Sequence, residues 1–228
     1  MRNFADNLWV FEGEAVSFLS LPFTTRMTII KLSDGNLWVH SPIRLTNMIK
    51  QHIQSLGTVK YLIAPNHLHH LFLGDWQAVY PDALCYGTDE VIKKRKDLTF
   101  NESLNVVQKW PWENDICQLL FTGSALMEEC VFFHKESQVL IVTDLIENFN
   151  GQSFKPWQRF IAKGVGIVAP NGKMPLDWRL SFIFHKPKAR QHLTLILSWK
   201  PQKIIMAHGI MIETQAVSFL KRSFSWLM

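Results

Sequence analysis

Three histidines, His67, His69 and His70, stand within four residues of one another, shortly after the apolar run at residues 59–63. That run has the composition of a β-strand, and Pro65-Asn66 ends it. Imidazoles gathered at the carboxyl end of a strand can converge on a metal ion, because neutral histidine nitrogen is a good zinc ligand. The alternative for any one of them is a packed, hydrogen-bonded side chain, the commoner fate of a single histidine in apolar surroundings.

Two later apolar runs also end in a residue of ligand type. Residues 139–142 lead into Thr143-Asp144, and residues 203–207 lead into His208-Gly209. Each has a plain alternative, since a strand-end Asp often caps a helix and a His-Gly pair can be a turn. Histidine nitrogen with carboxylate oxygen suits zinc or iron, and ligands drawn from several strand ends are typical of a catalytic site. We therefore predict a metal site at these strand ends.

The elements that must position these residues follow from the apolar pattern. Short β-type runs at 9–11, 16–19, 27–32 and 37–40 predict an antiparallel meander, with hairpin chemistry in residues 33–36. Residues 45–56 have helical spacing and end at Gly57, a C-cap signal. Further strands are predicted at 84–86, 106–107, 116–121 and 130–133, a helix from Ser181 to Trp199, and a last amphipathic helix carrying Ile212, Ala216, Phe219, Leu220, Phe224 and Leu227.

Length and composition favour one domain over residues 1–228, of α/β or α+β class. A chain of 228 residues with 47% hydrophobic residues can bury one sizeable core. No apolar run is long enough to span a bilayer, and the first residues lack the apolar block of a signal peptide, so we expect a cytoplasmic protein without a membrane partner. The three cysteines are widely spaced among apolar residues, as reduced core thiols are.

The net charge of +5 does not indicate nucleic-acid binding. The only dense basic cluster, residues 93–96, is flanked by Asp89, Glu90 and Asp97 on a predicted short helix. Mixed charges of this kind are typical of a solvated helix face, and no basic stripe interleaved with aromatic residues is present. We expect a small-molecule partner instead.

The order of these features resembles the metallo-β-lactamase-fold superfamily, whose hydrolases include glyoxalase II. The shared features are the meander, the histidine-rich turn, the strand ending in Thr-Asp and the late strand ending in Ala-His-Gly. Within the superfamily the chain is most similar to a little-characterised group with the turn Ala-Pro-Asn-x-x-His-His. The resemblance covers almost the whole chain and implies an αββα four-layer sandwich with a metal site at one edge of its two sheets.

The chain departs from the usual turn His-x-His-x-Asp-His of that superfamily. Pro65 matches the first histidine, His67 the second, His69 the aspartate and His70 the last histidine, while Ser124 stands at the histidine of a later Gly-His-Thr-like turn. The resemblance then implies a dismantled first metal position, where His67 is a lone remnant or an outer-shell residue. The second position keeps a full ligand set, and we expect at most one ion per chain, zinc or alternatively iron, held by His69, His70, Asp144 and His208.

These residues predict a metal-dependent hydrolase of a small acyl compound, an ester, thioester or lactone, that uses a metal-bound water. Asp144 is the candidate catalytic residue, because it could orient that water or take its proton. It could also fill the fourth coordination position and block the chemistry. The other hypothesis is a non-catalytic metal- or ligand-binding protein of the same fold, in which the altered turn marks loss of turnover. A nuclease is disfavoured, because too few ligands remain for two metals.

Overall fold

The computed structural model describes residues 1–18, 21–154 and 156–228. The chain divides into two compact units, Met1–Ile116 and Cys117–Met228. The expectation of one domain over residues 1–228 stays a prediction. Across the described residues, no helix is long and apolar enough to cross a membrane.

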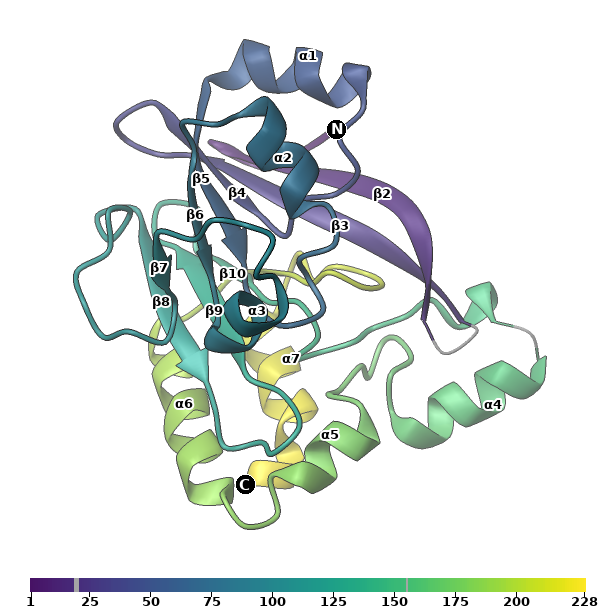
Figure 1. Cartoon of the computed structure of the whole chain (residues 1–228). Coiled ribbons are helices and arrows are strands. Elements are labelled where there is room, and N and C mark those ends of the chain that lie inside the picture. The colour runs from purple at the N-terminus through teal and green to yellow at the C-terminus, as the bar shows by residue number, and fades with distance from the viewer. Residues whose placement is uncertain (19–20, 155) are drawn as a thin grey trace. The chain divides into compact units, whose positions relative to one another are not determined.

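The first unit is built on a seven-stranded sheet whose strands follow the order of the chain (Figure 1). Strands β1 to β4 pair antiparallel, which confirms the predicted meander, and β4 to β7 pair parallel. The predicted run at 16–19 is the end of β2, and Leu19 lies outside the described residues. The strands are β1 (Arg2–Ala5), β2 (Leu8–Phe18), β3 (Leu21–Lys31), β4 (Asn36–His40), β5 (Thr58–Ala64), β6 (Leu84–Gly87) and β7 (Glu102–Ser103).

Three helices accompany this sheet: α1 (Asn47–Leu56), α2 (Leu73–Val79) and α3 (Asp89–Lys94). Helix α1 confirms the predicted amphipathic segment, because it buries Ile49 and Ile53 and its C-cap is Gly57. A Cβ at Gly57 would lie 2.8 Å from a backbone oxygen of the β3–β4 turn, so glycine permits this close approach. The apolar faces of the helices and strands share one buried cluster, which includes Ile29, Leu62 and Trp76.

The second unit has a four-stranded sheet in the order β11-β10-β9-β8. Its strands are β8 (Ile116–Phe121), which starts at the last residue of the first unit, β9 (Glu129–His134), β10 (Val139–Ile141) and β11 (Lys203–Ile205). Strand β10 pairs antiparallel with β9 and parallel with β11. Because β10 and β11 are parallel neighbours, their carboxyl ends lie at the same edge of the sheet.

Four α-helices of the second unit are described: α4 (Pro156–Val165), α5 (Leu176–Ser181), α6 (Lys186–Ser198) and α7 (Ala216–Ser223). Short 3₁₀ turns precede α4 and follow α7, at Gly151–Ser153 and Ser225–Leu227. Helix α6 packs on the sheet through Trp199 at its C-cap, whose ring stacks on Phe133 of β9 at 5.6 Å between centroids. The residue that follows α7, Phe224, also packs on the sheet, with its ring centroid 5.9 Å from that of Phe121 in β8.

Three predicted elements differ from the structure. Residues 106–107 form no strand, since the short strand is β7 and Val107 is fully exposed. The helix predicted from Ser181 to Trp199 is divided between α5 and α6, because Pro187 lies in the first turn of α6, where a residue without an N–H starts a helix rather than continuing one. Ile212 is not part of the last helix but forms a β-bridge with Ile204.

Candidate metal centre

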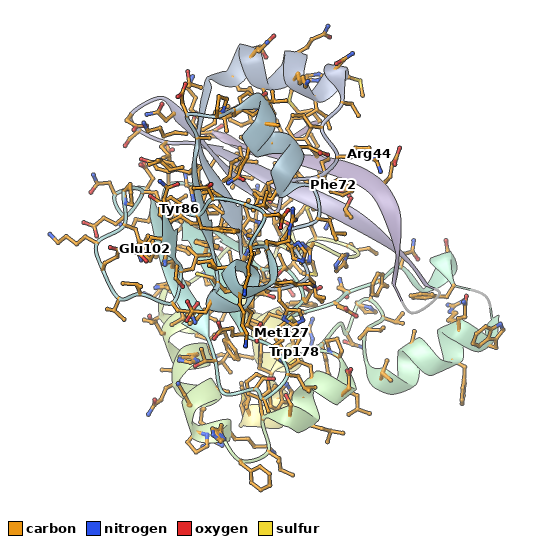
Figure 2. All side chains as sticks on the ribbon, in the orientation of Figure 1. Arg44, Phe72, Tyr86, Glu102, Met127 and Trp178 are labelled. Atoms are coloured by element: carbon orange, nitrogen blue, oxygen red, sulfur yellow. The ribbon has the colours of Figure 1, made fainter. Side chains whose placement is uncertain are left out.

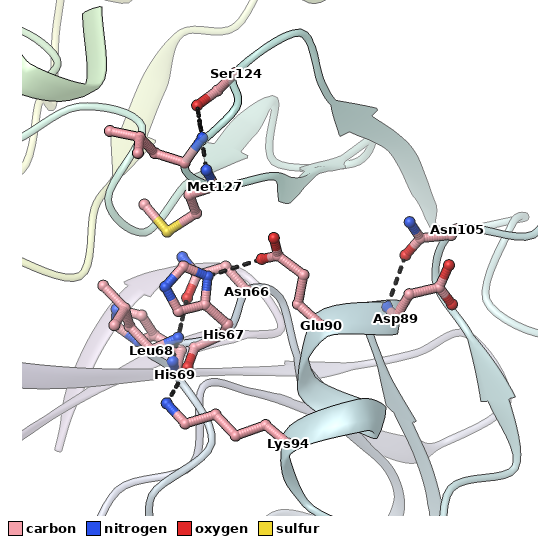
Figure 3. A network of polar contacts seen from close by, with 11 residues as sticks. Asn66, His67, Leu68, His69, Asp89, Glu90, Lys94, Asn105, Ser124 and Met127 are labelled. Carbon is pink, nitrogen blue, oxygen red and sulfur yellow. Dashed lines mark hydrogen bonds and ion pairs between the residues drawn. The ribbon is translucent and has the colours of Figure 1, made fainter. Parts of the chain in front are cut away.

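The histidine turn follows β5 directly and is shaped by Asn66. The Asn66 side chain is fully buried, and its Oδ1 accepts hydrogen bonds from the backbone N–H groups of Leu68 at 2.9 Å and His69 at 3.2 Å (Figure 3). A short side chain that bonds the backbone two and three residues on reverses the chain sharply. After the turn the chain enters α2, whose N-cap residue is Phe72. The guanidinium of Arg44 lies 5.4 Å from the ring centroid of Phe72 (Figure 2).

His69 contacts a hydroxyl through one ring nitrogen. Its Nδ1 lies within hydrogen-bonding distance of Ser41 Oγ, and Ser41 follows β4 in a left-handed conformation with φ of 54°. A hydroxyl can accept an N–H, so this contact is compatible with a proton on Nδ1 and a lone pair on Nε2. Metal-binding histidines are usually oriented in this way by a hydrogen bond from their second nitrogen.

His67 contacts α3 instead. Its Nδ1 lies 2.7 Å from Glu90 Oε2, and its carbonyl oxygen accepts a hydrogen bond from Lys94 Nζ at 3.1 Å (Figure 3). The His67 and Glu90 side chains are 28% and 40% exposed, so this is a partly solvated pair. His67 and His69 therefore have different neighbours, although only Leu68 separates them in the chain.

His70 is buried, and Arg95 at the end of α3 contacts it. Arg95 Nη1 donates to the carbonyl oxygen of His70 at 2.9 Å and to its ring Nδ1 at 3.2 Å. Burial, helped by the positive charges of Lys94 and Arg95, lowers the pKa of His70 to about 4, so the ring is neutral at pH 7. Its Nε2 is buried without a hydrogen-bond partner among the described residues.

Asp144 and His208 come together in the second unit. They follow the parallel neighbours β10 and β11, and His208 Nε2 lies 3.1 Å from Asp144 Oδ1, with both side chains 7% exposed. The ring of Phe149 stacks on His208 with 6.3 Å between centroids and an interplanar angle of 17°. The structure thus pairs the two ligand-type residues that the sequence places at these strand ends.

The His208-Gly209 turn requires glycine. Gly209 has φ of 86°, and a Cβ there would lie 2.3 Å from the carbonyl oxygen of Asn148. The same oxygen accepts the backbone N–H of Ile210 at 2.8 Å, and Asn148 Nδ2 donates to the Ile210 carbonyl at 2.8 Å. The loop after β11 is therefore joined to the loop that carries Asp144.

Glu129, which the sequence did not single out, holds the Asp144 loop. Its carboxylate is fully buried and accepts three consecutive backbone N–H groups, from Thr143 at 2.7 Å, Asp144 at 2.8 Å and Leu145 at 3.0 Å. Burial and the negative charge of Asp144 raise the pKa of Glu129, whereas these N–H groups favour its ionised form. An acid at the start of an apolar strand is the only sequence signal for this role.

Glu147 is a second buried acid close to the pair. It is 7% exposed, and burial, followed by the negative charge of Asp144, raises its pKa to about 8. A carboxyl with that pKa is protonated at neutral pH. It therefore adds no negative charge beside Asp144 there.

A cavity of about 620 Å³ lies in the second unit, beside the loop that follows Asp144. Two cationic side chains, Arg159 and Lys173, line it, and none of its lining residues in the described chain is acidic. Gly151 makes room for one of them, since a Cβ there would lie 3.2 Å from Arg159 Nε. The remaining lining residues are Asn150, Gln152, Gly166, Val168, Ala169, Pro170 and Asn171.

The convergence of His69 and His70 with Asp144 and His208 stays a prediction, because the two pairs belong to different units of the chain. The structure brings His208 to Asp144 and turns His67 toward Glu90. Ser124, which stands where the superfamily has a further histidine ligand, accepts the backbone N–H groups of Leu126 at 2.9 Å and Met127 at 3.1 Å and so shapes a turn (Figure 3).

Comparison of the sequence with known families gives one match. Residues 5–158 match a family described as "Domain of unknown function (DUF4336)". No curated protein is similar to the chain in sequence.

Solved structures with the same fold include three that cover nearly the whole chain. The DIM-1 metallo-β-lactamase has a TM-score of 0.68 at 13% identity, over 99% of this chain and 94% of its own. A metallo-β-lactamase from Pontibacter korlensis has a TM-score of 0.63 at 12% identity, over 99% and 97%. A fragment of a putative diflavin flavoprotein from Nostoc has a TM-score of 0.67 at 12% identity, over 98% and 92%. The predicted metallo-β-lactamase-like fold is confirmed.

Proposed function

The chain belongs to the DUF4336 family and has a metallo-β-lactamase-like fold, and from this premise we propose that it is a metal-dependent hydrolase of a small acyl compound, an ester, thioester or lactone. The observation that carries the proposal is the buried pair of Asp144 and His208 at the ends of two parallel strands. Two ligand-type groups held together away from solvent are what a metal site needs. The substrate class itself rests on analogy with the fold.

One ion would be held by His69, Asp144 and His208, which each offer one ligand atom. This donor set of two ring nitrogens and one carboxylate oxygen fits zinc, and iron as the alternative. The bound ion would supply a Lewis acid that polarises a carbonyl and lowers the pKa of a water molecule. Two contacts support a single ion: His67 is paired with Glu90, and Ser124 binds backbone N–H groups of its own turn.

Residues of the chain would position the water and bind the substrate. Asp144 orients the attacking water and accepts its proton, while Glu129 keeps the Asp144 loop in one conformation through its three N–H contacts. The cavity bordered by Arg159 and Lys173 has the size of a small-molecule site and favours a substrate with an anionic group. A small-molecule substrate, and neither nucleic acid nor membrane, is the partner that we propose.

The test combines metal content with turnover. Protein purified without added metal or chelator should carry one equivalent of zinc or iron by elemental analysis and hydrolyse some member of a panel of chromogenic esters, thioesters and lactones. Asp144→Asn should abolish turnover, and Asp177→Asn, a change at an exposed acid of α5, should leave it unchanged. Absence of bound metal, or full turnover by the Asp144 variant, would refute the proposal.

The loss of ligand types at Pro65 and Ser124 favours a second candidate, a non-catalytic protein of the same fold that binds a metal or a ligand. Pro65 stands at the first histidine of the His-x-His-x-Asp-His turn and Ser124 at the histidine of the later Gly-His-Thr-like turn, and the Ser124 hydroxyl accepts a backbone N–H of its own turn. One equivalent of bound metal without turnover on the whole panel would decide for this candidate.

A further inference from the structure

His69 and His70 are neighbours in the turn, but their rings have opposite hydrogen-bonding environments. His69 Nδ1 contacts a serine hydroxyl, which can accept a hydrogen bond. His70 Nδ1 contacts the guanidinium of Arg95, which can only donate. The Nδ1 atoms of the two rings therefore have different hydrogen-bonding partners, one that can accept and one that can only donate.

Arg95 is the C-cap residue of α3, and its side chain is itself held in place. Its Nε and Nη2 donate to the two carboxylate oxygens of Asp97 at 2.9 and 2.7 Å, which leaves Nη1 directed at His70. A bidentate arginine–carboxylate pair fixes the plane of the guanidinium. The donor at His70 Nδ1 is thus supported by a second, independent contact.

This contact assigns the tautomer of His70. A nitrogen that accepts from Arg95 cannot carry a proton, and a neutral imidazole has one proton, which must then be on Nε2. Nε2 is buried and without a partner among the described residues. Buried N–H groups nearly always find an acceptor, so this one is available to an acceptor that the described residues do not provide.

We infer that His70 is a hydrogen-bond donor rather than a metal ligand, and that its Nε2–H binds the carbonyl oxygen of the acyl substrate as negative charge develops there. The second part rests on the proposed hydrolase function. An Nε2 that carries the proton has no lone pair for an ion. If the proton moved to Nδ1, the Nδ1–H of His70 would face the Nη1–H of Arg95, and neither group could accept a hydrogen bond. A preorganised donor aimed at a developing oxyanion stabilises the transition state of acyl transfer.

The tautomer can be measured without metal or substrate. In chelator-treated protein labelled with ¹⁵N-histidine at pH 7, the NMR spectrum should show His70 protonated at Nε2 and bare at Nδ1. Arg95→Met removes the donor and should let the Nδ1–H form appear, whereas His52→Gln, a change on α1, should leave the His70 signals in place. A wild-type His70 with its proton on Nδ1 would overturn the inference whatever the protein hydrolyses.

Metal content separates a donor from a ligand. His70→Gln, which keeps an N–H group, and His70→Leu, which does not, should both retain one equivalent of zinc after zinc loading, whereas His69→Gln should lose it. On a substrate found in the panel, His70→Leu should lower kcat by about 10²–10³-fold, with partial rescue in His70→Gln. Loss of zinc from both His70 variants, with circular dichroism unchanged, would show that His70 is a ligand.

Discussion

At the scale of single residues, two buried acids near Asp144 have different surroundings. Burial and Asp144 raise the pKa of both, but Glu129 accepts three backbone N–H groups that favour its ionised form, whereas the pKa of Glu147 is raised to about 8. A carboxylate is stable inside a protein only where donors surround it. The two acids therefore respond differently to the same substitution.

Glu129→Gln should destabilise the protein by roughly 2 to 4 kcal/mol, because an amide N–H₂ would face a backbone N–H that now binds a carboxylate oxygen. Urea unfolding monitored by tryptophan fluorescence measures the loss. Asp82→Asn, a change at an exposed acid of the first unit, should alter stability by less than about 0.5 kcal/mol. Equal effects of the two substitutions would mean that the Glu129 contacts contribute little.

Glu147→Gln should change how stability depends on pH. The pKa of Glu147 is raised from 4.5 to about 8, so between these values the folded chain holds a proton that the unfolded chain releases. Stability then falls as pH rises through this window, by up to about 1.4 kcal/mol per pH unit from this group. The free energy of unfolding is measured with urea, in the presence of a chelator, for the wild type and the variant. The difference between the two proteins, wild type minus variant, should fall between pH 5 and 8. A difference that does not vary with pH would place the Glu147 pKa at its ordinary value.

At the scale of elements, the sequence predicts where strands end but not which strands meet. The spacing of apolar residues and the turn-forming residues locate His67 to His70, Asp144 and His208 at strand ends, since both signals depend only on residues that are close in the sequence. The parallel pairing of β10 with β11 joins segments about sixty residues apart, and only the folded chain shows it. For the same reason Glu129 was missed, because its partners are backbone groups of another strand end.

Gly209→Ala tests the junction of the two loops. The substitution places a methyl group 2.3 Å from the Asn148 carbonyl oxygen in a left-handed conformation, and it should destabilise the protein by roughly 2 to 4 kcal/mol and weaken metal binding. Gly164→Ala in α4 is the matched control, since a Cβ there meets nothing within 4 Å and alanine favours a helix. Differential scanning calorimetry should show a lower Tm for the first variant only.

At the scale of the whole molecule, the proposed ion is a ligand that binds only the folded chain. Its two histidine ligands must be neutral to bind, so metal occupancy in a competing chelator should fall as the solution is acidified. His208→Ala should abolish binding, and His67→Ala should weaken it by no more than roughly 10 to 100-fold, as expected for an outer-shell residue. Two equivalents of metal, or equal losses in the two variants, would show a different ligand set.

The cavity beside the Asp144 loop has a consequence for the speed of encounter. Arg159 and Lys173 line it without an acid among its described lining residues, so the positive potential of both cations extends from the cavity into solvent. Anionic solutes should therefore arrive faster than neutral ones of the same size, and this advantage should shrink once the Debye length falls below about 10 Å at 0.1 M salt. Discrimination between anionic and neutral compounds then begins during diffusion, before either is bound.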